Sequence, residues 1–415
     1  MSKKDKLSTE PYKGVRDFYP EDQAFLRYLL STYRGVAERF GYVEYHASVL
    51  EPAELYKAKG ADNEELVGEQ TYTFTDRGGR EVTLRPEMTP TVARMVAARR
   101  REFGFPLRLF SIPNVFRYER PQRGRLREHW QLNVDLFGSA SLAADAEIIA
   151  VAAETLKAFG ATEHDFVIKV GSRIFLNDLI QSLSLDEAAA KRFLGLLDRR
   201  AKMPESEFAQ ALTEFGATPE QLSANKTPTE VAEVLSLLST MGVENAVFDP
   251  SIVRGFAYYT GIVFEVFDTH PDNNRALFGG GRYENLLALF DDESVSGVGF
   301  GMGDVTMRDF LAVRNMLPPY LTPTTLYLAV TDHQVVPYAL TLAQTLRAEG
   351  VNVAVDFADR KLPDQIKNAT KHGIPYLIVL GPNEVSSGTM VVRNLETGAE
   401  KPLSKHELAA FFLAL

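Results

Sequence analysis

Four arginines crowd one short stretch of an otherwise acidic protein: Arg120, Arg123, Arg125 and Arg127. Pro121 and Gly124 lie among them, and from Phe116 to Phe137 the flanking residues alternate between apolar and polar side chains. This pattern predicts a long β-hairpin with a basic loop. Like charges repel unless an anion neutralises them, and the planar fork of arginine suits phosphate oxygens. The loop therefore favours polyphosphate binding, with a solvated surface loop as the simpler alternative.

A carboxylate and a hydroxyl follow a second predicted hairpin. Residues 72–84 alternate around Gly78 and Gly79, which predicts two strands and a turn, and they lead directly into Glu87 and Thr89. Both residues stand at the start of a predicted helix. A capping arrangement is the simplest explanation of the two polar groups when this segment is taken alone.

Three further segments carry glycine, arginine or tyrosine in patterns that suit a binding site. Arg254 precedes the adjacent residues Tyr258 and Tyr259, which a strand would direct to opposite faces, so that at least one belongs to the core. Tyr283 closes a Gly-Gly-Gly-Arg-Tyr run. Gly299, Gly301 and Gly303 stand at alternate positions of a predicted strand. Such glycines leave a flat face for a planar ligand, although packing explains most patterns of this kind.

The elements that must position these residues can be predicted from periodicity. Helices are expected at 22–40, 91–102 and 143–159, and strands at 42–50, 108–112 and 166–170. Helical segments with polar punctuation then run from 172 to 241, which predicts a helical insertion at about 172–245 in a domain with a mixed sheet.

A proline-rich linker at 317–323 precedes a small module with alternating strands and helices. Its strands are expected at 325–330, 351–357, 376–381 and 389–393, and its helices at 337–349 and 362–372. A flavodoxin-like domain is the structural alternative, but no glycine-rich phosphate loop follows the first strand.

Composition sets limits on the function. The 415 residues predict two or three domains. No apolar run reaches the roughly 20 residues of a membrane span, and the first residues lack an apolar signal core, so a cytoplasmic protein without membrane contact is expected. The absence of cysteine excludes disulfides, thiolate catalysis and cysteine zinc sites. The seven histidines show no i, i+4 spacing, so no metal site built by the protein is expected.

The net charge of −10 argues against a protein that coats nucleic acids non-specifically, although a local basic loop can still bind one RNA. The hairpin supplies that local basic patch. Its Phe-Arg-x-Glu segment at 116–119 and Gln-x-x-x-Asp segment at 131–135 resemble motif 2 of the class II aminoacyl-tRNA synthetases. The wording Arg-Gly-Arg-x-Arg-Glu-His-x-Gln at 123–131 is similar to that of histidyl-tRNA synthetases.

Other segments extend this resemblance from Tyr12 to about Leu403. They are Lys-Gly-Val-Arg-Asp at 13–17, Leu-Arg-Pro-Glu-Met-Thr at 84–89, Arg-Gly-Phe-Ala-Tyr-Tyr at 254–259 and the glycines of motif 3 at 299–303. The resemblance implies an α+β catalytic domain with an antiparallel sheet at 1–320, carrying the helical insertion, and a C-terminal α/β anticodon-binding domain at 321–415.

The resemblance also implies a role for each matching residue. Arg117 and Arg254 would be catalytic, beside the α-phosphate of ATP and the carboxylate of histidine. Histidine would be bound by Glu87, Thr89, Gln131, Asp135, Arg254, Tyr258, Tyr259 and Tyr283. ATP would be bound by Arg117, Glu119, Arg125, Arg127, His129, Gly299, Gly301 and Gly303. The acceptor end of tRNA would meet Arg120, Gln122 and Arg123.

The implied activity is histidine–tRNA ligation. ATP, with Mg²⁺, would activate L-histidine to histidyl-adenylate, and the acyl group would pass to the 3′ end of tRNA(His). A homodimer is also implied.

Three positions depart from the family pattern. Asp135 stands where many relatives have Glu, Ala257 stands where Asp is usual, and Thr306 takes the place of the motif 3 arginine. Arg308 follows Thr306 by two residues, so the two side chains would lie on different faces if this segment is a helix. Ala257 and Thr306 keep one alternative open, a non-catalytic histidine-sensing regulatory subunit of ATP phosphoribosyltransferase. The C-terminal module, which that subunit typically lacks, argues against it.

Overall fold

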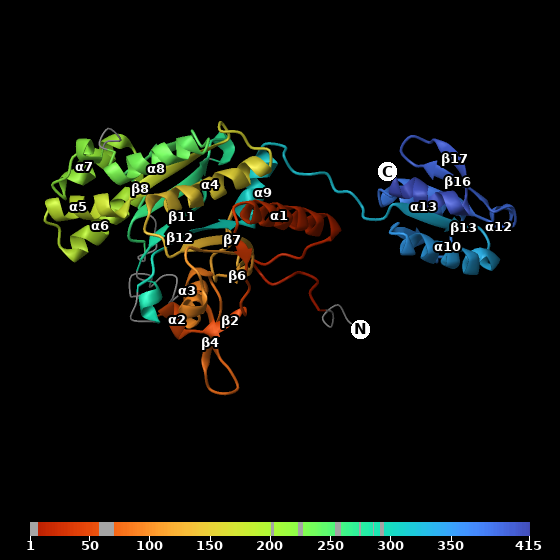
Figure 1. The fold of residues 1–415 in the computed structure, drawn as a ribbon, viewed down its shortest axis with the longest axis horizontal. Helices are drawn as coiled ribbons and strands as arrows, with labels where there is room; N and C mark the ends of the chain where they lie inside the picture. Colours follow the sequence, from red (N-terminus) through yellow and green to blue (C-terminus); the bar gives the residue numbers. More distant parts are fainter. Residues whose placement is uncertain are drawn as a thin grey trace. The chain divides into compact units, whose positions relative to one another are not determined.

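The structure of the protein is a computed structural model, which describes residues 7–57, 70–200, 203–222, 227–253, 259–273, 275–284, 286–290 and 294–415. Contacts between residues divide the chain into two compact units, Met1–Pro318 and Pro319–Leu415. Figure 1 shows the chain coloured along its sequence.

A nine-stranded sheet forms the centre of the first unit among the described residues, in the order β1-β5-β7-β12-β11-β10-β8-β9, with β6 paired to β7. All pairs are antiparallel except β1 with β5 and β8 with β9. The strands are β1 (Val43–Glu44), β5 (Leu107–Ser111), β6 (Asn114–Phe116), β7 (Glu128–Phe137), β8 (Phe166–Ser172), β9 (Ala246–Phe248), β10 (Ile262–Asp268), β11 (Ala276–Tyr283) and β12 (Gly297–Gly303). The predicted antiparallel sheet is therefore confirmed, with a parallel pair at each edge.

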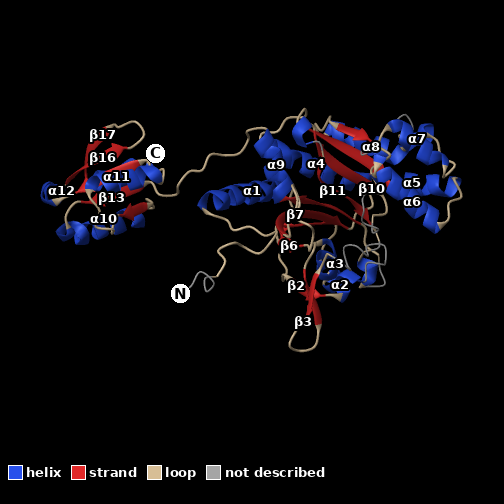
Figure 2. Ribbon diagram, turned by 180° about the vertical axis from the view of Figure 1, so that it is seen from behind, coloured by secondary structure: helices blue, strands red, loops and turns tan. Residues whose placement is uncertain are grey.

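Four helices cover one face of this sheet: α1 (Pro20–Arg39), α4 (Leu142–Ala158), α8 (Thr229–Thr240) and α9 (Asp304–Val313). Their apolar stripes pack against alternate residues of the strands, such as Leu132, Val134 and Leu136 of β7. Figure 2 shows α1, α4, α8 and α9 along the same side of the strands. This is the main hydrophobic core, and it leaves the opposite face of β7 and β12 available for polar side chains.

A smaller layer covers part of the opposite face. It contains a three-stranded sheet in the order β2-β4-β3, made of β2 (Leu50–Pro52), β4 (Glu81–Leu84) and β3 (Tyr72–Thr75). Three short helices and α3 complete the layer: α2 (Glu54–Lys57), α3 (Thr89–Ala98), η4 (Arg100–Glu102) and η9 (Leu287–Leu289). The expected strand at 42–50 was wrong, because β1 and β2 are short strands that belong to two different sheets. The expected helix at 91–102 begins at Thr89 and changes to a 3₁₀ turn after Ala98.

Helices fill the chain between β8 and β9. They are α5 (Arg173–Ser182), α6 (Glu187–Asp198), α7 (Glu205–Thr213), η6 (Pro219–Leu222) and α8. The first four enclose a core of their own, which includes Leu176, Phe193 and Phe208. In contrast, Val231, Val234 and Leu238 of α8 belong to the main core. Only the first four helices thus form a separate cluster at the end of the sheet (Figure 1).

The second unit contains a five-stranded sheet in the order β14-β13-β15-β16-β17. Its elements are β13 (Leu326–Val330), η10 (His333–Val335), α10 (Val336–Ala348), β14 (Val353–Val355), α11 (Leu362–Lys371), β15 (Tyr376–Leu380), α12 (Pro382–Ser387), β16 (Thr389–Asn394), β17 (Glu400–Ser404) and α13 (Lys405–Leu413). The predicted α/β module is present, and α12, β17 and α13 were not predicted.

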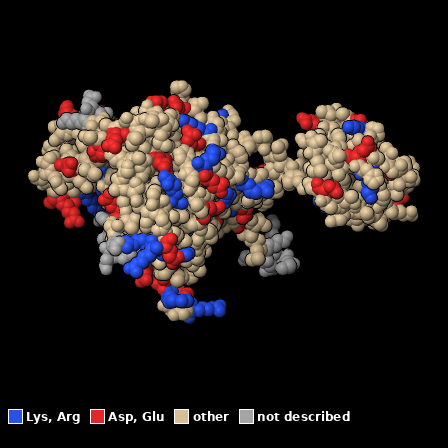
Figure 3. All heavy atoms as spheres, in the orientation of Figure 1, with Lys and Arg blue, Asp and Glu red and all other residues tan. Residues whose placement is uncertain are grey.

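The surface mixes acidic and basic side chains over the face of the first unit that Figure 3 presents. The negative net charge of the chain therefore does not produce one uniformly acidic field on that face. Among the helices of the described residues, none combines the length and the apolar character that crossing a membrane requires.

Candidate active site

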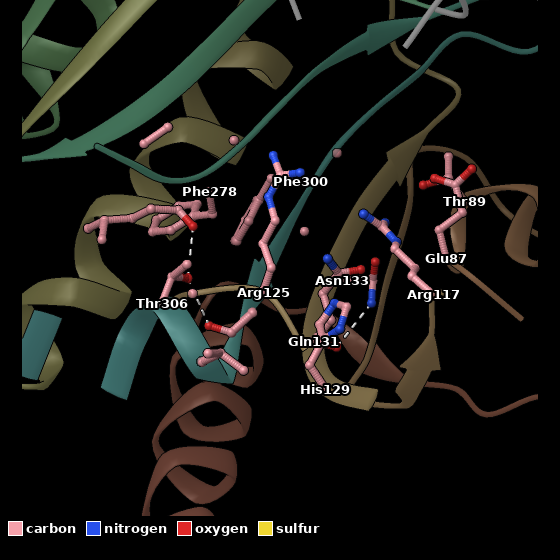
Figure 4. A pocket seen from close by; sticks show the side chains of 18 of the residues that line it. Glu87, Thr89, Arg117, Arg125, His129, Gln131, Asn133, Phe278, Phe300 and Thr306 are labelled. Atoms are coloured by element: carbon pink, nitrogen blue, oxygen red, sulfur yellow. Dashed lines mark hydrogen bonds between the residues drawn. The ribbon is translucent and has the colours of Figure 1, made fainter. Parts of the chain in front are cut away.

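A cavity of about 310 Å³ lies at the face of the central sheet that the main helices leave free. Motif 2 contributes Arg117, Glu119, Gly124, Arg125, Leu126, His129, Gln131, Asn133 and Asp135 to its lining. The remaining lining residues are Glu87, Thr89, Tyr259, Ala276, Leu277, Phe278, Gly279, Tyr283, Gly299, Phe300, Gly301, Gly303, Val305 and Thr306. Figure 4 shows Glu87, Thr89 and Arg117 toward one end, and Arg125, Phe278, Phe300 and Thr306 toward the other.

Strand register determines which residues reach this cavity. Side chains of a strand alternate between its faces, so Gln131, Asn133 and Asp135 of β7 all point away from the main core. Their partners on β12 are Gly303, Gly301 and Gly299. A Cβ atom on Gly299 would lie 2.4 Å from Asp135 Oδ1, and one on Gly301 would lie 2.9 Å from Gln131 Cδ. The glycines of β12 thus leave room for the polar side chains of β7.

Arg117 is fixed between the first two polar segments. Its Nε atom donates a hydrogen bond of 2.9 Å to the carbonyl oxygen of Pro86, immediately before Glu87. The buried side chain of Arg85 supports this junction by donating to the carbonyl oxygens of Asn114 and Ala47. Figure 4 shows the Arg117 guanidinium between Glu87 and Gln131. The arrangement presents a preorganised cation to any anion in the cavity.

Glu87 and Thr89 do not form the capping arrangement that their sequence also allowed. The N-cap of α3 is Met88, which makes no side-chain capping bond. Both Glu87 and Thr89 line the cavity instead, and Glu87 is buried. A buried carboxylate that faces a cavity suits a cationic group, because it offers only acceptor oxygens when ionised.

Asp135 lines the cavity and is buried. Its Oδ1 accepts a hydrogen bond of 2.5 Å from the Tyr283 hydroxyl, and within the described part of the chain its buried Oδ2 has no hydrogen-bond partner. Burial raises the pKa of Asp135 to about 7, although the bond from Tyr283 opposes this increase. The unpaired oxygen can accept a hydrogen bond from a ligand.

This raised pKa predicts a pH dependence of stability without ligand. The ordinary pKa of an aspartic acid is about 3.9, so the folded protein binds this proton more tightly than the unfolded chain does. The resulting stabilisation is fully present below about pH 4 and is lost as the pH rises through 7. Between pH 5 and 8, wild type should lose on the order of 2 kcal/mol more of its free energy of unfolding than Asp135→Asn.

Urea unfolding followed by tryptophan fluorescence measures this difference. Trp130 is the single tryptophan of the chain and belongs to β7, so its signal reports the first unit. Equal losses of stability in wild type and Asp135→Asn would contradict the raised pKa.

His129 lines the cavity as a neutral imidazole. Burial, followed by the positive charges of Arg117 and Arg16, lowers the pKa of His129 to about 3. A Cβ atom on Gly303 would lie 3.7 Å from its Cδ2 atom, so the ring faces the start of α9. A neutral aromatic ring at this position can stack on a planar ligand.

The motif 2 loop divides into residues that face the cavity and residues that do not. Glu119 and Arg125 line the cavity, with Glu119 Oε2 at 3.5 Å from Arg125 Nη1. Arg127 is outside the lining. Its guanidinium donates to the Tyr12 hydroxyl, Lys13 O and Glu119 O, and stacks on Tyr118 at 4.0 Å. Three more predicted residues also lie outside the lining: Arg120, Gln122 and Arg123.

The structure adds residues that sequence reasoning missed. Asn133 lies between Gln131 and Asp135 on the same face of β7, so its parity could have identified it. Phe278 and Phe300 lie in the glycine-rich strands, but neither residue carried a signal of its own. Thr306, which the sequence marked only as a departure from motif 3, also lines the cavity, and its hydroxyl donates to Leu277 O at 2.8 Å. Arg254, Ala257 and Tyr258 lie outside the described residues.

Comparisons with known proteins identify the family of the chain. The family model for histidyl-tRNA synthetase matches residues 14–304, and the family model for the anticodon binding domain matches residues 325–415. The histidine–tRNA ligase of Leptospira biflexa serovar Patoc is 41% identical over 417 residues, which cover 95% of this chain and 94% of that protein.

Solved structures show the same fold. The histidyl-tRNA synthetase from Nostoc sp. PCC 7120 superimposes with a TM-score of 0.82 at 24% identity, over 99% of this chain and 100% of that one. An ATP phosphoribosyltransferase regulatory subunit/histidyl-tRNA synthetase from Bacillus halodurans has a TM-score of 0.73 at 23% identity, over 90% of this chain and 98% of that one. The family models and the full-length similarity place the chain in the histidyl-tRNA synthetase family, as its motifs predicted.

Proposed function

We propose that this chain ligates histidine to tRNA(His) in two steps, both at the cavity between motif 2 and the glycine-rich strands. One observation carries the proposal. A single cavity is lined by two buried carboxylates, Glu87 and Asp135; Arg117 lies with Glu87 toward one end, and Arg125, whose partner is Glu119, lies toward the other. Such a cavity suits a cationic amino acid at one end and a nucleotide at the other.

In the first step, a carboxylate oxygen of histidine attacks the α-phosphorus of ATP. A bond forms between that oxygen and phosphorus, and the bond from phosphorus to the leaving pyrophosphate breaks. Arg117 neutralises charge on the α-phosphate and the attacking carboxylate, and Arg254 shares this role by its position in the family motif. Catalysis then comes mainly from orientation and charge stabilisation.

The histidine end of the cavity would recognise two groups of the substrate. The ammonium lies against Glu87 and Thr89, and an imidazole N–H donates to the unpaired Oδ2 of Asp135. Gln131, Tyr283 and Tyr259 line the same cavity, with Tyr258 assigned by sequence alone. Because a ligand without a donor would leave a buried carboxylate unpaired, other amino acids are disfavoured.

The nucleotide end would hold adenine and the phosphates. Glu119 accepts from the adenine amino group, His129 stacks on the ring, and the backbone of Gly299, Gly301 and Gly303 forms the floor. Arg125 faces the β- and γ-phosphates. Mg²⁺ would enter with ATP, since this ion is commonly held by phosphates and water with one or two carboxylates.

In the second step, the terminal ribose hydroxyl of tRNA attacks the acyl carbon of histidyl-adenylate, and AMP leaves. The motif 2 residues outside the cavity, Arg120, Gln122 and Arg123, would guide the acceptor end, and the second unit would bind the anticodon. Arg127 positions the loop through Tyr12 and Tyr118. The protein would act as a homodimer in the cytoplasm.

The test is histidine-dependent exchange of labelled pyrophosphate into ATP, with every other amino acid as a control. We expect exchange with histidine only, and its loss in Arg254→Ala. If the folded protein binds histidine but shows no pyrophosphate exchange, the result would instead support a regulatory subunit of ATP phosphoribosyltransferase. The departures from the family pattern at Ala257 and Thr306 would then explain the missing activity.

A further inference from the structure

The described residues of α9 that line the cavity are Val305 and Thr306, and neither carries a positive charge. Thr306 occupies the place of the motif 3 arginine, and its hydroxyl is committed to Leu277 O. Arg308, two residues later, points elsewhere: it pairs with Asp22 of α1 at 2.9 Å and lies over the Phe25 ring. If ATP binds here, as proposed above, another element must supply the charge that α9 does not.

Arg275 reaches this corner from the residue before β11. Its Nη2 atom donates a hydrogen bond to the carboxylate of Asp309, and its Nη1 atom donates a hydrogen bond of 2.7 Å to the carbonyl oxygen of Arg123. Asp309 follows Thr306 by three residues, so both lie on the same face of α9. Arg275 therefore connects the Thr306 face of α9 to the tip of the motif 2 loop.

The tip of the loop is shaped for this contact. Gln122 and Arg125 exchange two backbone hydrogen bonds of 3.1 and 2.9 Å, which close a tight turn. Gly124 in this turn has φ +76°, and a Cβ atom there would lie 2.2 Å from Arg275 Nη1. The guanidinium thus packs directly against the backbone of the turn, a contact that only glycine permits.

The turn at the tip of the loop also positions Arg125. This residue ends the turn that Arg275 holds, and its side chain lines the cavity (Figure 4). We propose that Arg275, anchored on Asp309, is a positioning residue that holds Arg125 toward the triphosphate of ATP and so compensates for the arginine missing at position 306. Arg275 acts through the loop and does not itself touch the nucleotide.

A double-mutant cycle tests this route. The readout is the KM for ATP in histidine-dependent pyrophosphate exchange, in wild type, Arg275→Ala, Arg125→Ala and the double variant. Arg125→Ala should raise the KM for ATP by about tenfold, because a charge-assisted contact to phosphate is lost. Arg275→Ala should produce most of that increase and leave the KM for histidine unchanged. In the Arg125→Ala background, Arg275→Ala should then add less than twofold.

Arg308→Ala is the matched control. It removes the ion pair between Arg308 and Asp22, and Arg308 is the residue of α9 next to Asp309. It should leave the KM for ATP unchanged, and urea unfolding by Trp130 fluorescence should show similar midpoints for Arg308→Ala and Arg275→Ala. A normal KM for ATP in Arg275→Ala would overturn the proposal. Independent, multiplying effects of the two substitutions would also overturn it, since Arg275 would then act without Arg125.

Gly124→Ala provides a second variant that keeps every charge. The added methyl group would displace the turn from Arg275, so the same rise in the KM for ATP is expected. Wild-type exchange with histidine establishes the proposed function separately. Failure of the cycle in an enzyme that still exchanges pyrophosphate would reject only the role of Arg275.

Discussion

Arg117→Ala is expected to lower the kcat of histidine-dependent pyrophosphate exchange by on the order of 10²–10³-fold. The Nε bond to Pro86 O fixes the guanidinium before any substrate arrives, so its charge needs no rearrangement during the reaction. Without it, the charge that develops on the α-phosphate is left to Arg254 and solvent. Steady-state exchange over a range of ATP and histidine concentrations separates kcat from both KM values.

Arg117→Lys is the control for this prediction. Lysine keeps a positive charge but cannot donate to Pro86 O and hold two anionic oxygens in one plane. It should therefore recover only part of the lost rate. An alanine variant with exchange near the wild-type rate, and with unchanged unfolding by Trp130 fluorescence, would show that the phosphoryl group reacts away from Arg117.

Asp135→Asn should reduce kcat/KM for histidine by about 10²-fold while the KM for ATP stays within about twofold. The carboxylate can accept from two donors at once, the Tyr283 hydroxyl and an imidazole N–H. An amide of the same shape has one acceptor oxygen and no negative charge, so the hydrogen bond that it can accept from the imidazole N–H is weaker. The loss therefore falls on the amino acid and not on the nucleotide.

Tyr283→Phe provides the matched comparison, because it removes one donor and leaves the acceptor intact. A smaller loss, about tenfold in kcat/KM for histidine, is expected. If Asp135→Asn impairs the use of ATP as strongly as the use of histidine, the substitution distorts the sheet. A normal kcat/KM for histidine in this variant would show that Asp135 is not part of the histidine site.

Parity along strands made much of the site predictable. Gln131 and Asp135 are an even number of residues apart in one strand, so they must share a face, and the alternating glycines of β12 must lie opposite such residues in some neighbouring strand. The same reasoning failed at 42–50, because β1 contains only two residues and its pairing with β5 depends on distant partners. Short edge strands carry too few residues for a period to show.

The charged contacts behind the cavity could not be predicted from the sequence. Arg275 and Asp309 are 34 residues apart, and Arg16 and Asp304 are 288 apart. Each of these four residues is a single charged side chain in a segment whose sequence is also typical of a solvent-exposed surface. The role of Arg127 was implied by resemblance, but only the structure shows its guanidinium turned toward Tyr12 and Tyr118. Single side chains reveal their partners only after the chain has folded.

The glycines of β12 also bear on inhibitor resistance. A compound that lies flat on Gly299 and Gly301 would contact peptide groups, which no substitution can delete. The remaining way to block it is to add a side chain, but a Cβ atom at either glycine would collide with Asp135 or Gln131. As proposed above, those two residues bind histidine. Escape at this floor would therefore cost the enzyme its own substrate, and resistant variants should be sought at the motif 2 loop instead.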